Sequence, residues 1–329
     1  MNISYTHESI RLTGRWDVSD PKVAVTTATG SYLEFAFEGK MALVHFDTFA
    51  NANPLLHLWI QLDGGDMIEA AISNHLRVLA KQEGKHVCRI VYKGGVENAR
   101  RWYTPLTGKV SFVGVQTEKP LPLPTDERPT IEFVGDSITE GVLIDTDFAY
   151  PNELLSYNGQ DYRPYQDDAC ATYAWLTAEA LNLRPVFMGY GAVGVTKAGQ
   201  GSVPAAAAAY PFNFEGSPIS HAPSDYVVIN HGANDRGKPA ETYLAKYAEL
   251  LDVIRQYNPK ATVIAVSPFC GAFHRELGEM IERYNKENGC SVGYVDTFGW
   301  SPEEPLHPMR DGHEIVAQKL ADKIKEIIQ

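Results

Sequence analysis

Cysteine is scarce in this chain of 329 residues, and the four cysteines lie far apart. None belongs to a CxxC pair, so we expect free thiols at Cys88, Cys170, Cys270 and Cys290. Long hydrophobic runs are missing too, because no stretch approaches the roughly 18 apolar residues of a membrane helix. The histidines of the first half lack metal-binding spacing, and we predict neither a metal nor a cofactor.

Basic residues are in deficit. Lysine and arginine number 29 against 41 aspartates and glutamates, which gives a formal net charge of −12. Nucleic acids and anionic membranes bind basic surfaces, so this balance predicts no nucleic-acid partner and no membrane partner. The first residues, Met1–Glu8, lack the basic start and apolar stretch of an export signal, which predicts a cytoplasmic protein.

The first half of the chain contains short alternating strands. Leu33–Phe37 and Leu56–Leu62 alternate apolar with polar or small residues, and the second run leads into Asp63-Gly64-Gly65, a hairpin turn signal. Many short strands with glycine-rich turns predict an all-β domain, a β-sandwich or jelly roll, over residues 1–118. The other strand-like runs are Met41–Phe46, His86–Tyr92 and Lys109–Val115.

A proline-rich segment separates this half from one with a different period. Residues 119–129 contain four prolines and predict an extended linker. Beyond it, over residues 130–329, strands alternate with helices, which is typical of a parallel sheet covered on both faces. The predicted strands are Thr130–Val134, Pro185–Met188, Tyr226–Asn230, Thr262–Val266 and Ser291–Val295, and the predicted helices are Thr172–Leu181, Glu241–Tyr257, Glu276–Asn285 and Asp311–Ile328.

Residues capable of chemistry follow four of these strands. In parallel α/β sheets, functional groups collect just past the carboxyl ends of the strands. Ser137, Gly194 and Asn234 follow the first three strands, and His307 follows the fifth. We therefore expect these residues to converge on one edge of the sheet.

This set of residue types fits acyl transfer. Ser137 is the predicted nucleophile, and His307 can take its proton near neutral pH. The tetrahedral intermediate carries an oxyanion, which needs fixed hydrogen-bond donors. We expect these donors to be the backbone N–H groups of Ser137 and Gly194 and the side-chain amide of Asn234.

Four sequence blocks resemble, in order and spacing, those of the SGNH (GDSL) hydrolase superfamily: Gly-Asp-Ser-Ile-Thr at 135–139, Gly194, Gly-Ala-Asn-Asp at 232–235 and Leu-His-Pro at 306–308. The resemblance implies an α/β fold, a flavodoxin-like α/β/α sandwich with strand order 2-1-3-4-5, and metal-free ester hydrolysis. A β-rich domain placed before such a domain is similar to carbohydrate esterase family 2. Members of that family carry an N-terminal jelly roll and remove acetyl groups from plant polysaccharides or their oligosaccharides.

Position 304 departs from the superfamily pattern. The residue three places before the catalytic histidine is usually aspartate, and here it is Glu304. We expect Glu304 to orient His307 as the third catalytic residue. Glu303, Asp296 or a backbone carbonyl are alternatives, and some relatives in carbohydrate esterase family 2 work as Ser-His dyads.

Two further histidines have structural explanations. His313 competes with His307 for the role of base, but Asp311 looks like a helix N-cap that places His313 in the first turn of the last helix. His231 is expected to pack and hydrogen-bond beside Asn234 rather than to react.

Two features near the predicted site keep several interpretations. Trp300 precedes the histidine loop, and it predicts either a platform on which a sugar stacks or a core residue. The acidic and aromatic insertion Asp145–Asp168 predicts a loop near the site, with a lid, a calcium loop and a solvated loop as alternatives.

The sequence therefore predicts a serine esterase that removes acetyl groups from a carbohydrate, such as acetylated xylo- or manno-oligosaccharides, or that acts on a small ester. A short-chain lipase, thioesterase or arylesterase on the same domain is one alternative, although the polar insertion argues against a long acyl channel. A glycan-binding protein with a vestigial esterase site is the other, although the complete Ser, Gly, Asn and His set argues against it. The oligomeric state is left open.

Overall fold

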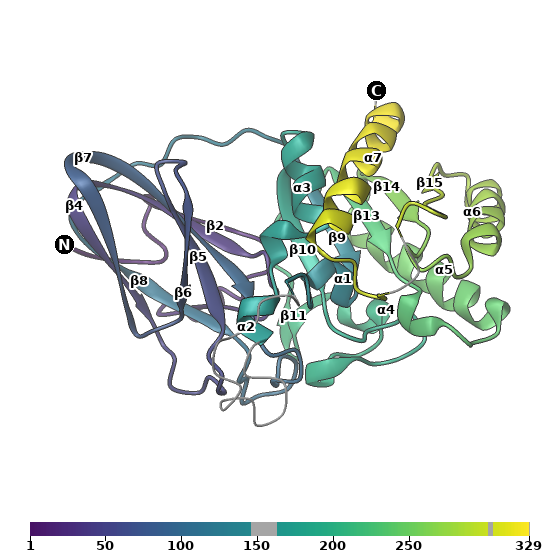
Figure 1. The fold of residues 1–329 in the computed structure, drawn as a ribbon, viewed down its shortest axis with the longest axis horizontal. Helices are drawn as coiled ribbons and strands as arrows, with labels where there is room; N and C mark the ends of the chain where they lie inside the picture. The colour runs from purple at the N-terminus through teal and green to yellow at the C-terminus, as the bar shows by residue number, and fades with distance from the viewer. Residues whose placement is uncertain (146–162, 302–304, 329) are drawn as a thin grey trace.

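The computed structural model describes residues 1–145, 163–301 and 305–328, and it consists of an antiparallel sheet beside a parallel sheet with helices (Figure 1). Most of the insertion Asp145–Asp168 lies outside the described residues, and so does Glu304. Within the described ranges, no helix is both long enough and apolar enough to cross a membrane.

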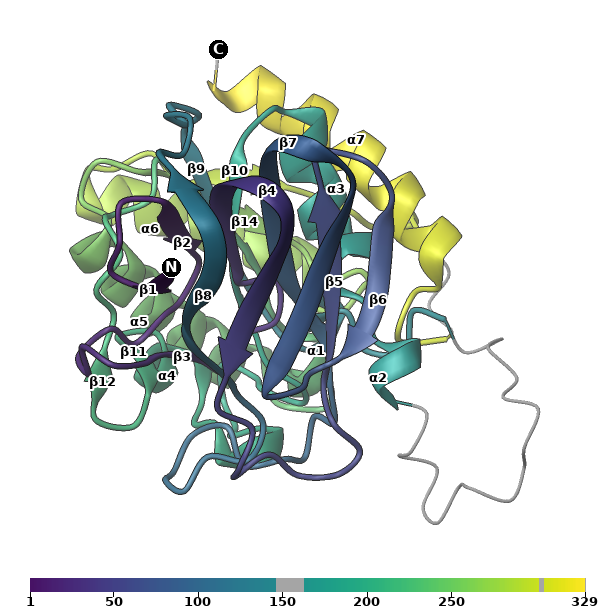
Figure 2. The same ribbon diagram turned by 90° about the vertical axis from the view of Figure 1, so that its left-hand side faces the viewer.

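The first half forms an eight-stranded antiparallel sheet (Figure 2), which we call the β-domain. Its strand order is β1-β8-β4-β7-β5-β6, with β2 paired to β4 and β3 paired to β8. Alternate residues of β4, including Leu33 and Phe35, enter one core of this domain, whereas Tyr32 faces the second half of the chain. The strands are β1 Asn2–Ser4, β2 Ile10–Thr13, β3 Ala24–Thr26, β4 Tyr32–Phe46, β5 His57–Leu62, β6 Met67–Ala71, β7 His75–Gly94 and β8 Val110–Leu121.

The two longest strands, β4 and β7, are irregular where Gly39 lies opposite Gly84. The register shifts between Gly39 and Met41, and Gly39 has a φ of +131°, which side chains rarely allow. The sequence pattern predicted Leu33–Phe37 and Met41–Phe46 as separate strands. That separation is wrong, because a bulge interrupts the alternation without ending the pairing.

The second half contains a parallel sheet of five strands in the order β10-β9-β13-β14-β15. Numbered along this half, that order is 2-1-3-4-5, as predicted. A two-stranded ribbon of β11 and β12 lies beside it. The strands are β9 Thr130–Gly135, β10 Arg184–Gly189, β11 Phe212–Phe214, β12 Ser217–Pro218, β13 Tyr226–Asn230, β14 Thr262–Val266 and β15 Gly293–Val295, and the helices are α1 Ser137–Glu140, α2 Arg163–Gln166, α3 Tyr173–Ala180, α4 Ala206–Ala209, α5 Ala240–Tyr257, α6 His274–Asn288 and α7 Arg310–Ile328.

Helices cover both faces of the parallel sheet because its buried strands carry apolar residues on both sides (Figure 1). On β13, Val227 and Ile229 pack into a core with α5 and α6, while Val228 faces α3 and α7. On β14, Val263 and Ile264 divide between the same two cores. All neighbouring strands pair in parallel, so the carboxyl ends of all five strands lie at one edge.

The predicted fold class, an α/β SGNH-type domain preceded by an all-β domain, is confirmed by these two sheets. The jelly-roll connectivity of the first half stays a prediction, and so do the domain boundaries. The strand β8 continues to Leu121, and β9 begins at Thr130.

A buried ion pair joins the two sheets. Arg15 of the β-domain donates to Glu132 in the middle of β9 from Nη2 (2.7 Å) and from Nε (3.1 Å), and both side chains are fully buried. Its remaining nitrogen, Nη1, donates to the carbonyls of Tyr210 (2.8 Å) and Phe212 (3.1 Å). Burial opposes the charge on Arg15, but Glu132 outweighs that effect and raises the Arg15 pKa. The interface between the two halves of the chain thus contains fully buried charges that are paired and hydrogen-bonded, as in the interior of a protein.

We predict that Arg15→Met lowers the free energy of unfolding by about 3–5 kcal/mol, because it leaves Glu132 buried without its cation. Urea unfolding followed by circular dichroism measures this change. Lys119→Met is the control, since the Lys119–Glu38 pair is exposed to solvent, and its midpoint should stay near that of the parent. Equal midpoints for Arg15→Met and the parent would contradict the prediction.

Candidate active site

Ser137 lies at a tight turn between β9 and α1. Asp136 caps the helix, and its carboxylate accepts a hydrogen bond from the backbone N–H of Ile138 (3.0 Å). Gly135 is required just before it, since a Cβ there would lie 2.0 Å from the Thr139 hydroxyl. The turn brings the serine to the carboxyl end of β9, as the sequence predicted.

His307 reaches the same point from the loop that precedes α7. Its Nε2 lies 2.8 Å from the Ser137 hydroxyl, although 170 residues separate the two in sequence. Burial lowers the pKa of His307 below its ordinary value, Glu97 opposes that shift, and Arg163 adds to it. A neutral imidazole in hydrogen-bond contact with a serine hydroxyl has the geometry of a general base and its nucleophile.

Gly194 lies in the loop that follows β10, next to Asp235. A Cβ at Gly194 would come within 2.6 Å of a carboxylate oxygen of Asp235, so only glycine fits. Asp235 accepts hydrogen bonds from the N–H groups of Val195 (3.1 Å) and Thr196 (2.9 Å). The N–H of Gly194 itself donates to the carbonyl of Lys197 (3.1 Å). Asp235 therefore braces the loop that carries the predicted oxyanion donor.

Asn234 connects the third block to the first. Its Nδ2 donates to Asp136 Oδ2 (3.2 Å) and to the carbonyl of Val193 (3.1 Å). Burial, together with the nearby charge of Asp235, raises the pKa of Asp136 to about 7, and the bonds from Ile138 and Asn234 oppose that rise. The amide thus lies between the serine turn and the Gly194 loop, and its role as an oxyanion donor stays a prediction.

His313, the competitor of His307, and His231, the expected neighbour of Asn234, are both buried. His313 Nδ1 accepts a hydrogen bond from the backbone N–H of Tyr173 (2.9 Å), and burial lowers the pKa of His313 to about 3. His231 is buried as well, with its pKa lowered to about 4. The predicted N-cap is wrong, because α7 begins at Arg310 and Asp311 is therefore already inside its first turn.

The other predicted residues contact different partners or lie outside the described residues. Glu303 and Glu304 are not among the described residues. Asp296 Oδ2 lies 3.3 Å from Nδ1 of a different histidine, His274. Trp300 is partly buried against the core that contains α7, with Lys319 Nζ 5.8 Å from its ring centroid. The orienting role of Glu304 and the substrate-binding role of Trp300 stay predictions.

Contacts between the β-domain and the serine helix were not predicted from the sequence. Arg101 forms a buried ion pair with Glu140, the last residue of α1, and its guanidinium lies over the ring of Tyr190. Thr29 donates to the carbonyl of Glu140 (2.9 Å). These contacts join residues far apart in the chain, and no local pattern marks them.

Comparison with known proteins places these blocks in a family. The model of the GDSL-like Lipase/Acylhydrolase family matches residues 133–315, which is more than half of the chain. The chain belongs to this family. The match supports the prediction of a carboxylic ester hydrolase, and it covers Ser137, Gly194, Asn234 and His307.

The relatives of this GDSL family member include carbohydrate esterases. The chain is 26% identical over 340 aligned positions to the cellulase/esterase CelE of Acetivibrio thermocellus, covering 95% of this chain and 39% of that protein. In fold, it resembles a family two carbohydrate esterase from Cellvibrio japonicus, with a TM-score of 0.80, 18% identity and coverage of 99% and 97% of the two chains. It also resembles a family two carbohydrate esterase from Clostridium thermocellum in complex with cellohexaose, with a TM-score of 0.76, 22% identity and coverage of 97% and 99%.

We predict that, among His307, His231 and His313, only His307 begins to take up a proton between pH 6.5 and pH 5. In an NMR titration of the imidazole nitrogens, His307 should become protonated below pH 6.5, while His231 and His313 stay neutral down to pH 5. A His307→Asn variant assigns its signal. Protonation of His313 above pH 6 would show that His313 is not held neutral by burial and would contradict the prediction.

Proposed function

We propose that this protein is a serine esterase that removes small acyl groups, chiefly acetyl, from a carbohydrate. The observation that carries the proposal is the contact of 2.8 Å between Ser137 Oγ and His307 Nε2 beside the Gly194 loop and Asn234. Membership of the GDSL-like family supports ester hydrolysis. The names of its relatives, which include a cellulase/esterase and family two carbohydrate esterases, support a carbohydrate as the alcohol component.

In the proposed reaction, Ser137 Oγ attacks the acyl carbonyl while His307 takes the hydroxyl proton. The tetrahedral intermediate then collapses, and the sugar oxygen leaves with the proton that His307 returns. A water molecule attacks the acyl-enzyme, again giving its proton to His307. That proton returns to Ser137 Oγ as the carboxylic acid departs, so the free enzyme is restored.

The oxyanion would be held by the N–H groups of Ser137 and Gly194 and by the amide of Asn234. The two N–H bonds of the Asn234 amide are directed to Asp136 and Val193, and the Gly194 N–H is directed to Lys197. A bound oxyanion would therefore replace acceptors that these donors have in the unliganded protein. Polar acceptors of this kind keep the donors in place between turnovers.

The comparisons support the acetylated sugar only at the level of a class. The chain spans 39% of the length of CelE, so the activity of that whole protein does not transfer to it directly. An acetyl xylan esterase from the rumen bacterium Butyrivibrio proteoclasticus has the same fold, with a TM-score of 0.78 at 17% identity. We therefore propose acetylated oligosaccharides as substrates and leave the sugar and the acetylated position to experiment.

We predict that Ser137→Ala abolishes hydrolysis of p-nitrophenyl acetate and of acetylated xylo- and manno-oligosaccharides, because it removes the nucleophile. Release of acetate, followed by mass spectrometry of the sugar products, measures the loss. Circular dichroism should show an unchanged fold. Near-normal turnover by Ser137→Ala would refute the mechanism, and faster cleavage of octanoyl than of acetyl esters would favour a lipase.

We also predict that Asn234→Ala lowers kcat by roughly 10²–10³, because one oxyanion donor is lost. KM should change much less, since this donor acts mainly in the transition state. Steady-state kinetics with p-nitrophenyl acetate separates the two constants. An unchanged kcat would remove Asn234 from the oxyanion site.

A further inference from the structure

Two histidines of the β-domain meet across neighbouring strands. His45, the last residue but one of β4, lies directly opposite His75, the first residue of β7. Their Nδ1 atoms are 3.0 Å apart, and the planes of the two rings are nearly perpendicular, at 88°. Because 30 positions separate the two residues in the chain, the spacing of histidines along the sequence does not reveal this pair.

The pairing of β4 with β7 brings the two imidazoles together. Residues directly opposite each other on antiparallel strands have Cβ atoms about 4.5–5.5 Å apart, so their side chains lie side by side. Next to the pair, the N–H of Phe46 donates to the carbonyl of Asn74 (3.1 Å), and Thr48 Oγ1 donates to Asn74 Oδ1 (2.6 Å). These bonds tie the end of β4 to the start of β7, so the histidines are held close before any ligand binds.

Water has access to the pair. His75 is exposed, and His45 is partly exposed. On the other side of His45, its partner in β8 is Gly114, which has no side chain that could cover the imidazole. Among the described residues, no third histidine, cysteine, aspartate or glutamate joins them in a metal-binding group, so water would supply the remaining ligands of a bound ion.

The separation of the two nitrogens fits coordination to one metal ion. A histidine nitrogen lies about 2.0–2.1 Å from a bound zinc ion. At such bond lengths, two nitrogens are about 2.9 Å apart for a bond angle of about 90° and about 3.4 Å apart for the tetrahedral angle. The 3.0 Å between His45 and His75 is close to the first value, and square or tetragonal geometry is typical of Cu²⁺ and Ni²⁺. A metal ion can therefore take the place of the proton that the two nitrogens share.

We propose that His45 and His75 form a binding site for a divalent transition-metal ion, with Cu²⁺ bound most tightly. Imidazole is a ligand that these ions prefer, and affinity along the first row of transition metals is highest for Cu²⁺. A bound ion would link β4 to β7 and stabilise the folded protein, because the unfolded chain does not hold the two histidines together. The proposed ester hydrolysis uses neither histidine.

The test is a titration of the full-length protein with CuCl₂, followed by isothermal titration calorimetry. Electron paramagnetic resonance of the complex should show splitting by two imidazole nitrogens. His45→Asn and His75→Asn should each weaken Cu²⁺ binding by at least about tenfold, because a lost ligand costs no less than a lost outer-shell partner. Cu²⁺ should also raise the unfolding midpoint of the parent and leave that of either variant unchanged. If His45→Asn does not fold, His75→Asn decides, since its side chain is exposed.

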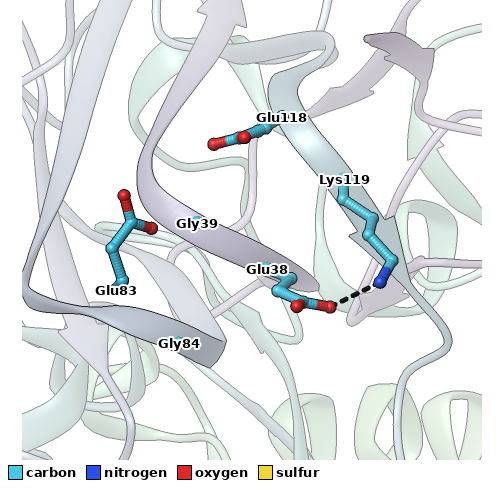
Figure 3. A pocket seen from close by; sticks show the side chains of 6 residues that line it. All are labelled: Glu38, Gly39, Glu83, Gly84, Glu118 and Lys119. Carbon is cyan, nitrogen blue, oxygen red and sulfur yellow. Dashed lines mark hydrogen bonds and ion pairs between the residues drawn. The ribbon is translucent and has the colours of Figure 1, made fainter.

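Two control variants test whether any histidine or any negative charge on this sheet suffices. His86→Asn removes a histidine of the same strand β7, whose Nδ1 lies 2.7 Å from the carboxylate of Asp63. Glu83→Gln removes a carboxylate from a pocket on the same two strands, which Glu38 and Glu118 also line (Figure 3). Neither change should alter the affinity for Cu²⁺, because carboxylate oxygens suit Mg²⁺ and Ca²⁺ better.

Absence of Cu²⁺ binding by the parent, or binding that His45→Asn and His75→Asn both retain, would overturn the proposal and leave the pair as a hydrogen bond only. An equal loss of affinity in His86→Asn or Glu83→Gln would overturn it too, since the binding would then be unspecific. His75→Asn should hydrolyse p-nitrophenyl acetate as the parent does. The result for the metal site is therefore independent of the proposed function.

Discussion

The buried ion pair between Arg101 and Glu140 is the contact on which the geometry of the site depends. Glu140 ends the four-residue helix that begins with Ser137, and so short a helix has little stability of its own. Arg101 reaches it from the β-domain, and removing either partner would leave an uncompensated charge in the interior. Ser137, the proposed nucleophile, therefore begins a helix that contacts from both halves of the chain hold in place.

Carboxylates cap and brace the loops around Ser137. Asp136 caps the serine helix and accepts from Asn234, and Asp235 accepts from two backbone N–H groups next to Gly194. Burying these groups carries a free-energy penalty, which the pKa of Asp136, raised to about 7, makes visible. The hydrogen bonds offset that penalty and give each loop a defined shape, which a set of fixed oxyanion donors requires.

The family match and the fold comparisons describe different extents of the molecule. The family model begins at residue 133, within β9, and so leaves out the β-domain. The two family two carbohydrate esterases compared above align with 99% and 97% of this chain, so the similarity in fold includes both halves. This agrees with the buried Arg15–Glu132 pair, because an interface that buries charge in both partners favours halves that fold as one unit.

Local patterns in the sequence were enough to predict several strands and the candidate site residues. The strands β13 and β14 begin and end where their apolar runs predicted. The four blocks of residues that follow the strands predicted Ser137, Gly194, Asn234 and His307 as candidate site residues. Only the tertiary structure decided that β4 is one strand, that Asp311 is inside its helix, and that Arg101, Glu97 and Arg15 pair with residues of the other half. The hydrophobic periodicity of an element indicates which of its faces is buried. A charged residue that pairs with another about 40 to 120 positions away leaves no local pattern, because only folding brings the two together.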